Sequence, residues 1–126
     1  MTRGTDHFAI ACRDPATLAR WYCETLGLRI VIDNGQQPPT YLLGGAEGAM
    51  LEVMPDNGAP RHARSHPLEP GLSHIAFRVD DFEAAYAALK AAAVRALSEP
   101  RPALGGGKIA FFEDPEGNLL QIVWRP

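Results

Sequence analysis

The chain has 126 residues, 46% of them hydrophobic and 21% charged, and this length predicts one compact domain rather than two independent ones. A net charge of −3, with Lys and Arg scattered and no basic run, gives no reason to expect binding to nucleic acid or to an anionic membrane surface. No stretch approaches the roughly 20 apolar residues that span a bilayer, and the first residues lack the apolar core of a signal peptide, so we expect a cytoplasmic protein with a small-molecule partner.

The first half of the chain predicts one strand, one helix and three more strands. Residues 7–13 form the first strand, and Asp14-Pro15 then supplies an N-cap followed by proline at the first helical position. The helix runs to about Leu26 and ends at Gly27 as a left-handed cap. Three strands follow, at residues 28–32, 40–43 and 49–54.

The second half repeats this order after a linker at residues 55–70 that contains four prolines. We expect a strand at 73–79, a helix capped by Asp80-Asp81 that fades near Ala93, and a short strand at 94–100. Residues 101–107, with three consecutive glycines, predict a mobile loop. The last two strands, joined by a tight hairpin turn at 113–118, lie at 108–112 and 119–124.

The two halves also match residue by residue. His7 and His74, Ala9 and Ala76, and Asp14 and Asp81 are each 67 residues apart, which indicates two copies of one unit. We therefore predict an α+β fold of two tandem βαβββ modules, at about 5–54 and 71–126. Each would be a curled sheet with a helix on one face, and the pair would enclose a cleft.

Four polar residues occupy equivalent strand positions in the two copies. When residues 50–54 are aligned with 119–123, Glu52 matches Gln121, and each is flanked by apolar neighbours. Such strands suit burial, and a buried polar group needs a partner. Converging in the cleft, His7, Glu52, His74 and Gln121 would suit a divalent ion such as Ni, Co, Zn, Fe or Mn. Taken singly, each has a plainer interpretation: a core or rim histidine, an edge carboxylate, or an amide bonded to backbone.

Other candidate groups favour structural roles. Cys12 and Cys23 form no CxxC pair and are expected to be buried thiols in a reducing cytosol. His62 and His66 lie in the linker beside arginines, which is typical of a solvated loop. Trp21, Tyr22 and Phe82 stand at helical spacings and are expected in the core, whereas four other aromatic residues could face the cleft: Tyr41, Phe77, Phe111 and Trp124.

With these residues in view, the chain resembles the vicinal oxygen chelate superfamily along essentially its whole length. The resemblance rests on the strand-borne histidines, the run Asp14 to Leu28, and the ending Phe-Glu-Asp-Pro-Glu-Gly-Asn-Leu-Leu-Gln at 112–121. That superfamily includes glyoxalase I, bleomycin-resistance proteins, extradiol dioxygenases, methylmalonyl-CoA epimerase and fosfomycin-resistance enzymes.

The resemblance implies that the first, fourth, fifth and eighth strands supply metal ligands, which are His7, Glu52, His74 and Gln121 in this chain. The first three match the bacterial glyoxalase I pattern. Gln121 departs from it, because Glu is usual at that position and an amide takes no proton near neutral pH. Glu52 would then be the catalytic base.

The implied function is metal-dependent proton transfer, as a glyoxalase-like lyase or isomerase, on a substrate whose vicinal oxygens chelate the ion. Two alternatives stay open: an extradiol-type ring-cleaving dioxygenase with iron on two histidines and Glu52, and a metal-free drug-binding module. The resemblance also implies a homodimer, with the site formed within one chain or across two. A glutathione adduct would need a cation, and the candidates are Arg13, Arg29, Arg101 and Lys108.

Overall fold

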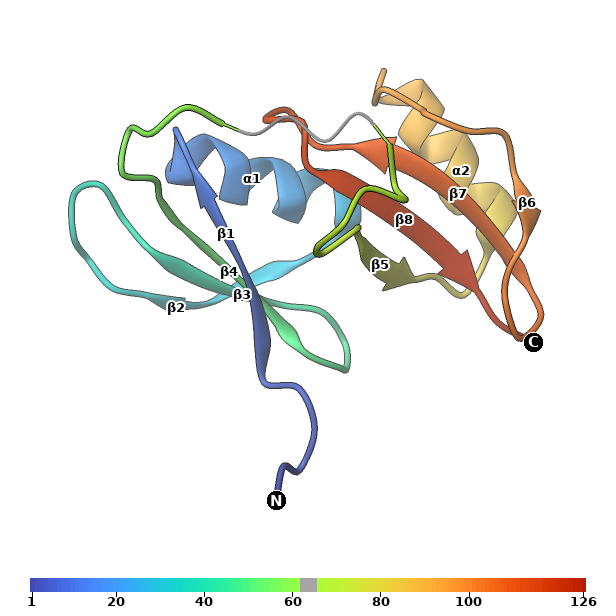
Figure 1. The fold of residues 1–126 in the computed structure, drawn as a ribbon, viewed down its shortest axis with the longest axis horizontal. Coiled ribbons are helices and arrows are strands. Elements are labelled where there is room, and N and C mark those ends of the chain that lie inside the picture. Colours follow the sequence, from blue (N-terminus) through green and yellow to red (C-terminus); the bar gives the residue numbers. More distant parts are fainter. Residues whose placement is uncertain (62–65) are drawn as a thin grey trace. The chain divides into compact units, whose positions relative to one another are not determined.

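The computed structural model describes residues 1–61 and 66–126. The chain divides into two compact units, residues 1–61 and 62–126, and the division falls inside the predicted linker. Each unit has the element order β-α-β-β-β, as Figure 1 shows along the colour gradient from blue to red. The two tandem βαβββ modules are therefore confirmed. The expectation for His62 lies outside the described residues.

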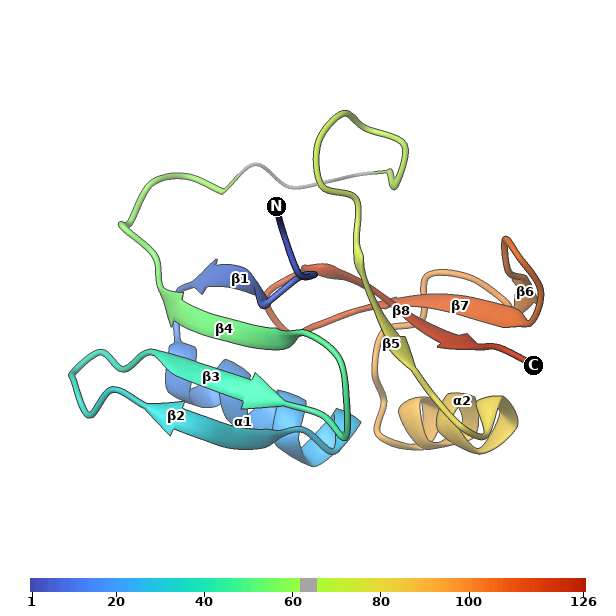
Figure 2. The same cartoon turned by 90° about the horizontal axis from the view of Figure 1, so that it is seen from below.

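The first unit is a four-stranded mixed sheet with one helix. Its strands run in the order β1-β4-β3-β2, with β1 parallel to β4 and the other pairs antiparallel, and Figure 2 shows them side by side. Its elements are β1 (His7–Cys12), α1 (Pro15–Leu26), β2 (Arg29–Asp33), β3 (Tyr41–Gly44) and β4 (Met50–Pro55).

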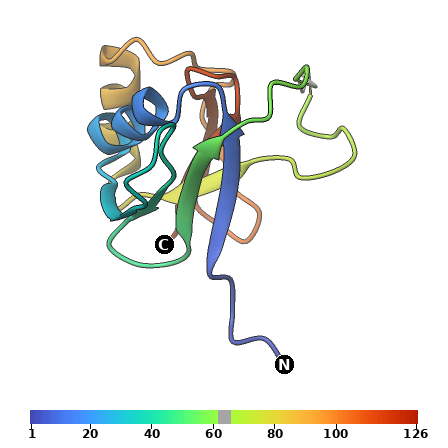
Figure 3. The same cartoon turned by 90° about the vertical axis from the view of Figure 1, so that its left-hand side faces the viewer.

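Helix α1 begins and ends where the sequence signals lie. The Asp14 carboxylate accepts the Thr17 backbone N–H at 3.1 Å, and Gly27 adopts a φ of 70°, a left-handed conformation that suits glycine. The helix covers one face of its sheet, as Figure 3 shows, and packs on it the side chains of Leu18, Ala19 and Tyr22. Beneath them lie the buried strand residues Ile10, Cys12, Leu43, Leu51 and Val53.

The second unit has the same architecture. Its strands run in the order β5-β8-β7-β6, with β5 parallel to β8 and the other pairs antiparallel. Phe82 and Leu89 of the helix pack against Ala110, Phe112, Leu120 and Ile122, all buried. Its elements are β5 (Ile75–Arg78), α2 (Phe82–Ala91), β6 (Arg101–Pro102), β7 (Lys108–Glu113) and β8 (Leu119–Trp124).

Three predictions for this unit were wrong in detail. Strand β5 is shorter than expected, so that His74 stands one residue before it. Residues 94–100 form no strand and contribute a single bridge, Ala96 to Phe112. The Ser98 hydroxyl accepts the Phe111 backbone N–H at 2.9 Å, in place of the carbonyl that a regular strand would supply. The edge strand is instead the two-residue β6, inside the segment expected to be a mobile loop.

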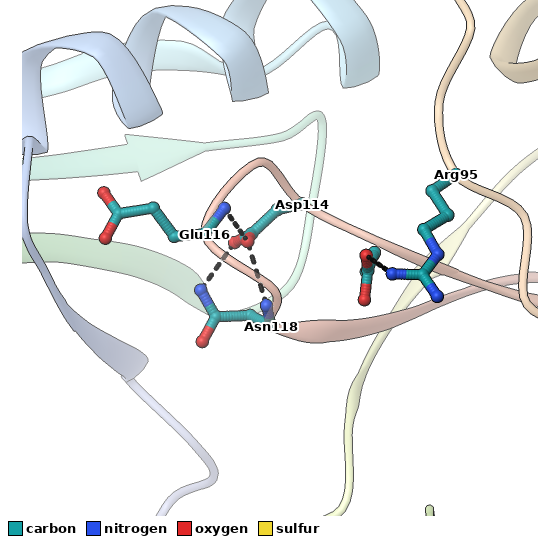
Figure 4. Close-up of polar contacts among 5 residues, drawn as sticks. Arg95, Asp114, Glu116 and Asn118 are labelled. Carbon is teal, nitrogen blue, oxygen red and sulfur yellow. Dashed lines mark hydrogen bonds and ion pairs between the residues drawn. The ribbon is translucent and has the colours of Figure 1, made fainter. Parts of the chain in front are cut away.

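The turn between β7 and β8 is built around the buried carboxylate of Asp114. This carboxylate accepts the backbone N–H groups of Glu116 and Asn118, both at 2.9 Å, and the Asn118 side-chain amide at 2.7 Å (Figure 4). Beside the turn, Arg95 donates to Glu113 at 2.9 Å. These contacts fix the pairing of β8 with β7 and therefore the position of Gln121.

Across residues 1–61 and 66–126, no helix is both long and apolar enough to cross a membrane.

Candidate metal-binding residues

The strand registers of the two units place the four predicted ligands in equivalent positions. In the first unit Glu52 pairs with Ala9, and His7 lies two residues before Ala9 on the parallel neighbour strand. In the second unit Gln121 pairs with Ala76, and His74 lies two residues before Ala76. The internal repeat that the sequence indicated is thus present in the hydrogen-bonded pairing itself.

In each unit these residues occupy the sheet face that the helix leaves uncovered. Neighbouring strand residues point to opposite faces, and the buried Ile10, Leu51 and Val53 pack toward α1. His7 and Glu52 therefore point away from α1. By the same alternation Gln121 points away from α2, because Leu120 and Ile122 on either side of it belong to the helix-facing core.

In the first unit His7 and Glu52 face each other at close range. The Nε2 atom of His7 lies 3.9 Å from Oε2 of Glu52, and the Nδ1–H of His7 donates to Oδ2 of Asp6 at 2.7 Å. The hydrogen bond to Asp6 raises the pKa of His7, and the charges of Asp6 and Glu52 act in the same direction. Metal bonds to nitrogen or oxygen are about 2.0–2.2 Å long, so one ion fits between donors this far apart.

In the second unit His74 and Gln121 share their face with Phe111. Phe111 pairs with Gln121 across β7 and β8, and the His74 ring meets the Phe111 ring edge-on with centroids 5.0 Å apart. The Ser73 hydroxyl lies 2.8 Å from Nδ1 of His74. Gln121 is only 7% exposed, and no described residue is seen to hydrogen-bond its amide, so the amide oxygen is available to a ligand.

Each unit therefore carries one imidazole and one oxygen donor of the predicted set. Among the described residues, no three His, Cys, Asp or Glu side chains gather closely enough to hold a metal ion. A four-ligand metal site therefore stays a prediction.

The structure also sorts the aromatic and cationic candidates. Phe111 lies on the face of Gln121, whereas Tyr41, Phe77 and Trp124 alternate onto the helix-facing sides of their sheets. Arg101 of β6 lies over the Phe111 ring, 5.1 Å from its centroid, and no carboxylate of the described chain pairs with it. Lys108 is bound to Glu83 of α2, and Arg29 donates to the Gly45 carbonyl at 2.8 Å.

Asp6 and Ser73 were not among the predicted residues. They immediately precede the two histidines, so extending the internal repeat by one residue toward the N-terminus places them at equivalent positions. The signal was missed because an aspartate and a serine share little beyond a side-chain oxygen.

The remaining candidates are structural. Cys12 is buried in the core and Cys23 is partly buried; burial raises the pKa of the Cys23 thiol, with the Glu24 charge acting in the same direction, which makes it a poorer nucleophile. A small apolar pocket between α2 and β7 contains none of the predicted ligands. It is lined by Tyr86, Leu89, Lys90, Val94, Ala96, Ala110, Phe111 and Phe112.

Comparison with known proteins identifies the family. The sequence profile of the Glyoxalase/Bleomycin resistance protein/Dioxygenase superfamily matches residues 4–122. The chain belongs to this superfamily. The superfamily includes enzymes and is typically metal-dependent.

Individual superfamily members are distant in sequence and close in fold. A protein of Vibrio parahaemolyticus named "Probable lactoylglutathione lyase" is 29% identical over 111 residues, covering 82% of this chain and 78% of its own length. The uncharacterized protein YaeR of Escherichia coli is 28% identical over 118 residues, covering 92% of each. The crystal structure of a glyoxalase family protein from Enterococcus faecalis superimposes with a TM-score of 0.76 at 26% identity, over 96% of this chain and 97% of that one.

Proposed function

We propose that this superfamily member is a divalent-metal-dependent, glyoxalase-like enzyme that transfers a proton on a small substrate with vicinal oxygens. In this proposal the ion is held by four side chains: His7, Glu52, His74 and Gln121. Support comes from the registers of β1 with β4 and of β5 with β8. In each unit the oxygen donor, Glu52 or Gln121, pairs with an alanine of the neighbouring strand, and the histidine lies two residues before that alanine.

The donor set fits a borderline divalent ion. Two imidazoles, one carboxylate and one amide oxygen suit Ni, Co, Zn, Fe or Mn. When bound, the ion supplies Lewis-acid stabilisation of negative charge on the substrate oxygens. The protein's task is to hold the substrate, exclude water and move the proton.

Glu52 is the residue we assign as the proton-transferring base. It is the one carboxylate of the quartet, its side chain is 26% exposed, and its Oε2 lies 3.9 Å from Nε2 of His7. A carboxylate with this partial access can accept a proton from a substrate carbon and return it to the adjacent carbon. Gln121 can bind through its amide oxygen but cannot take that role.

Arg101 is the cation we assign to an anionic group of the substrate. Of the four candidates that the sequence offered, it lies on the face of His74 and Gln121, with its guanidinium over Phe111. The Vibrio relative is named after a glutathione adduct, lactoylglutathione. Glutathione carries carboxylates, and a guanidinium can bind a carboxylate with two parallel hydrogen bonds.

The test is turnover by metal-loaded protein of the hemithioacetal formed from glutathione and a 2-oxoaldehyde. We expect activity in the wild type and its loss in Glu52→Gln, while Glu47→Gln, an exposed glutamate in the turn before β4, keeps it. No turnover with any of the five metals would refute this reaction. Oxygen uptake with a catechol on iron-loaded protein would assign ring cleavage instead.

We also propose a homodimer, and the half-sites provide a test of how it is built. One variant loses both ligands of the first unit (His7→Ala/Glu52→Ala) and another loses both of the second (His74→Ala/Gln121→Ala). If sites form across chains, co-expression restores about one quarter of the wild-type metal content, since half of the dimers are mixed and each has one intact site. If sites form within one chain, none returns. We also propose a cytoplasmic location, because Cys12 and Cys23 are thiols and not a disulfide, which favours a reducing compartment.

A further inference from the structure

Each predicted metal-binding histidine is held by the side chain of the residue just before it. Oδ2 of Asp6 lies 2.7 Å from Nδ1 of His7, and Oγ of Ser73 lies 2.8 Å from Nδ1 of His74. Both contacts engage Nδ1 of the imidazole ring. In the first unit Nε2 is the atom that faces Glu52, at 3.9 Å.

The backbone of Asp6 is fixed at the point where the two strands of the half-site meet. Its carbonyl accepts the N–H of Met50 at 3.0 Å, one residue before β1 and at the first residue of β4. This bond anchors the residue that carries the carboxylate to the strand that carries Glu52. The backbone of Asp6 is therefore held in place beside the half-site, and its carboxylate reaches His7 from there.

The two holding groups differ in charge, and the difference matters for the charge of a metal site. A divalent ion bound by His7, Glu52, His74 and Gln121 would keep a net charge of about +1, because Glu52 is the one anion among them. A carboxylate hydrogen-bonded to a ligating imidazole makes that imidazole a stronger donor and adds a negative charge next to the ion. Asp6 brings the second charge that the amide of Gln121 lacks.

We propose that Asp6 is a positioning residue that orients His7 through Nδ1 and supplies the negative charge missing from Gln121. Ser73 orients His74 without adding charge. This inference rests on the proposed metal site. It adds that the second negative charge near the ion comes from Asp6, which is not a metal ligand and acts through its hydrogen bond to His7.

The two contacts are expected to matter unequally. The His74 ring is held by Ser73 and also by the edge of Phe111, with centroids 5.0 Å apart. His7 is 41% exposed, and no aromatic ring of the described chain is seen against it, so its orientation depends more on Asp6. Removing Asp6 should lower metal affinity more than removing Ser73.

The experiment measures the dissociation constant of Co²⁺ by competition with a chelating dye, for the full-length metal-free protein. We expect Asp6→Ala to weaken binding by about 10- to 100-fold and Asp6→Asn, which keeps the acceptor and loses the charge, by about tenfold. Ser73→Ala should change it by less than about threefold. Asp56→Asn is the matched control, because this exposed aspartate lies at the opposite end of the same strand pair and its N–H bond to Cys12 is on the backbone.

A charge-relocation variant and the Co²⁺ absorption spectrum separate positioning from ligation. Moving the carboxylate to the other histidine, in Asp6→Asn/Ser73→Asp, should restore most of the affinity. The visible bands of bound Co²⁺ should keep their positions in Asp6→Asn, because the ligands are unchanged; shifted bands would make Asp6 a ligand and overturn the positioning role.

Wild-type affinity in both Asp6 variants would overturn the inference while leaving the metal site in place. Wild-type affinity in Asp6→Asn alone would overturn the charge argument. Failure of the wild type itself to bind Co²⁺ would overturn both this inference and the proposed function.

Discussion

A single substitution at Gln121 tests whether this side chain faces the proposed metal ion. Its side chain is 7% exposed on the central strand β8, between Ala76 and Phe111. Gln121→Glu changes an amide to a carboxylate of the same shape. Without metal the new charge is desolvated on this face, and we expect a loss of about 2 kcal/mol in the free energy of unfolding. For a chain of this length that lowers the Tm by roughly 6–10 °C.

Metal should reverse most of this loss. If the side chain faces the ion, a second anionic ligand raises affinity at least about tenfold. At a metal concentration 100 times the wild-type Kd, binding stabilises the wild type by about 2.7 kcal/mol and the tighter variant by about 4.1 kcal/mol. The difference in stability between the two proteins should therefore shrink from about 2 to about 0.6 kcal/mol.

Thermal unfolding with and without metal measures both quantities in one experiment. Gln36→Glu is the matched control, since this exposed loop glutamine should change stability by less than about 0.5 kcal/mol and leave the metal-induced shift unaltered. An equal metal-induced shift in the wild type and in Gln121→Glu would refute the view that this side chain faces the ion.

Three further predictions concern catalysis, pH and the β7–β8 turn. Glu52→Gln should lower kcat by about 10²- to 10⁴-fold with little change in substrate binding, and full activity in steady-state assays would remove Glu52 as the base. Asp6 raises the pKa of His7, so His7 stabilises the metal-free fold below the pKa of an unperturbed histidine, about 6.5, and loses this contribution as the pH rises through the raised value. Urea unfolding of wild type and His7→Gln should accordingly differ most near pH 5.5 and least above about pH 8; a constant gap would contradict this. Asp114→Ala should cost about 2 kcal/mol, because three N–H donors lose a buried carboxylate, and an unchanged urea midpoint would show that the turn does not depend on it.

Much of the fold could be predicted because local signals and the internal repeat agree. Asp14-Pro15 and Gly27 mark the ends of α1 to the residue, and the repeat carried the pattern of the first half into the second. The edge of the second sheet could not be predicted. The segment before Ser98 makes backbone hydrogen bonds to β7 at Arg95 and Leu97, but the Ser98 hydroxyl then takes the place of a backbone carbonyl and the pairing stops. The edge strand is formed instead by Arg101 and Pro102, which stand near a glycine run typical of a loop.

The candidate site was only partly accessible from sequence. The internal repeat predicted that His7 corresponds to His74, and Glu52 to Gln121, in the two units. The strand pairing confirms that these positions are equivalent. The contacts that orient the imidazoles are a different matter. A bond between neighbours such as Asp6 and His7 depends on side-chain rotamers and on backbone anchoring to β4, which no spacing rule expresses.

The measurement that tests the central claim most directly is the metal content of protein purified without chelator or affinity tag. It is made for the wild type and for His7→Ala/His74→Ala, which removes one imidazole from each unit. The account predicts about one divalent ion per chain in the wild type and almost none in the double variant. Absence of metal from the wild type even after reconstitution, or equal metal in both proteins, would contradict it.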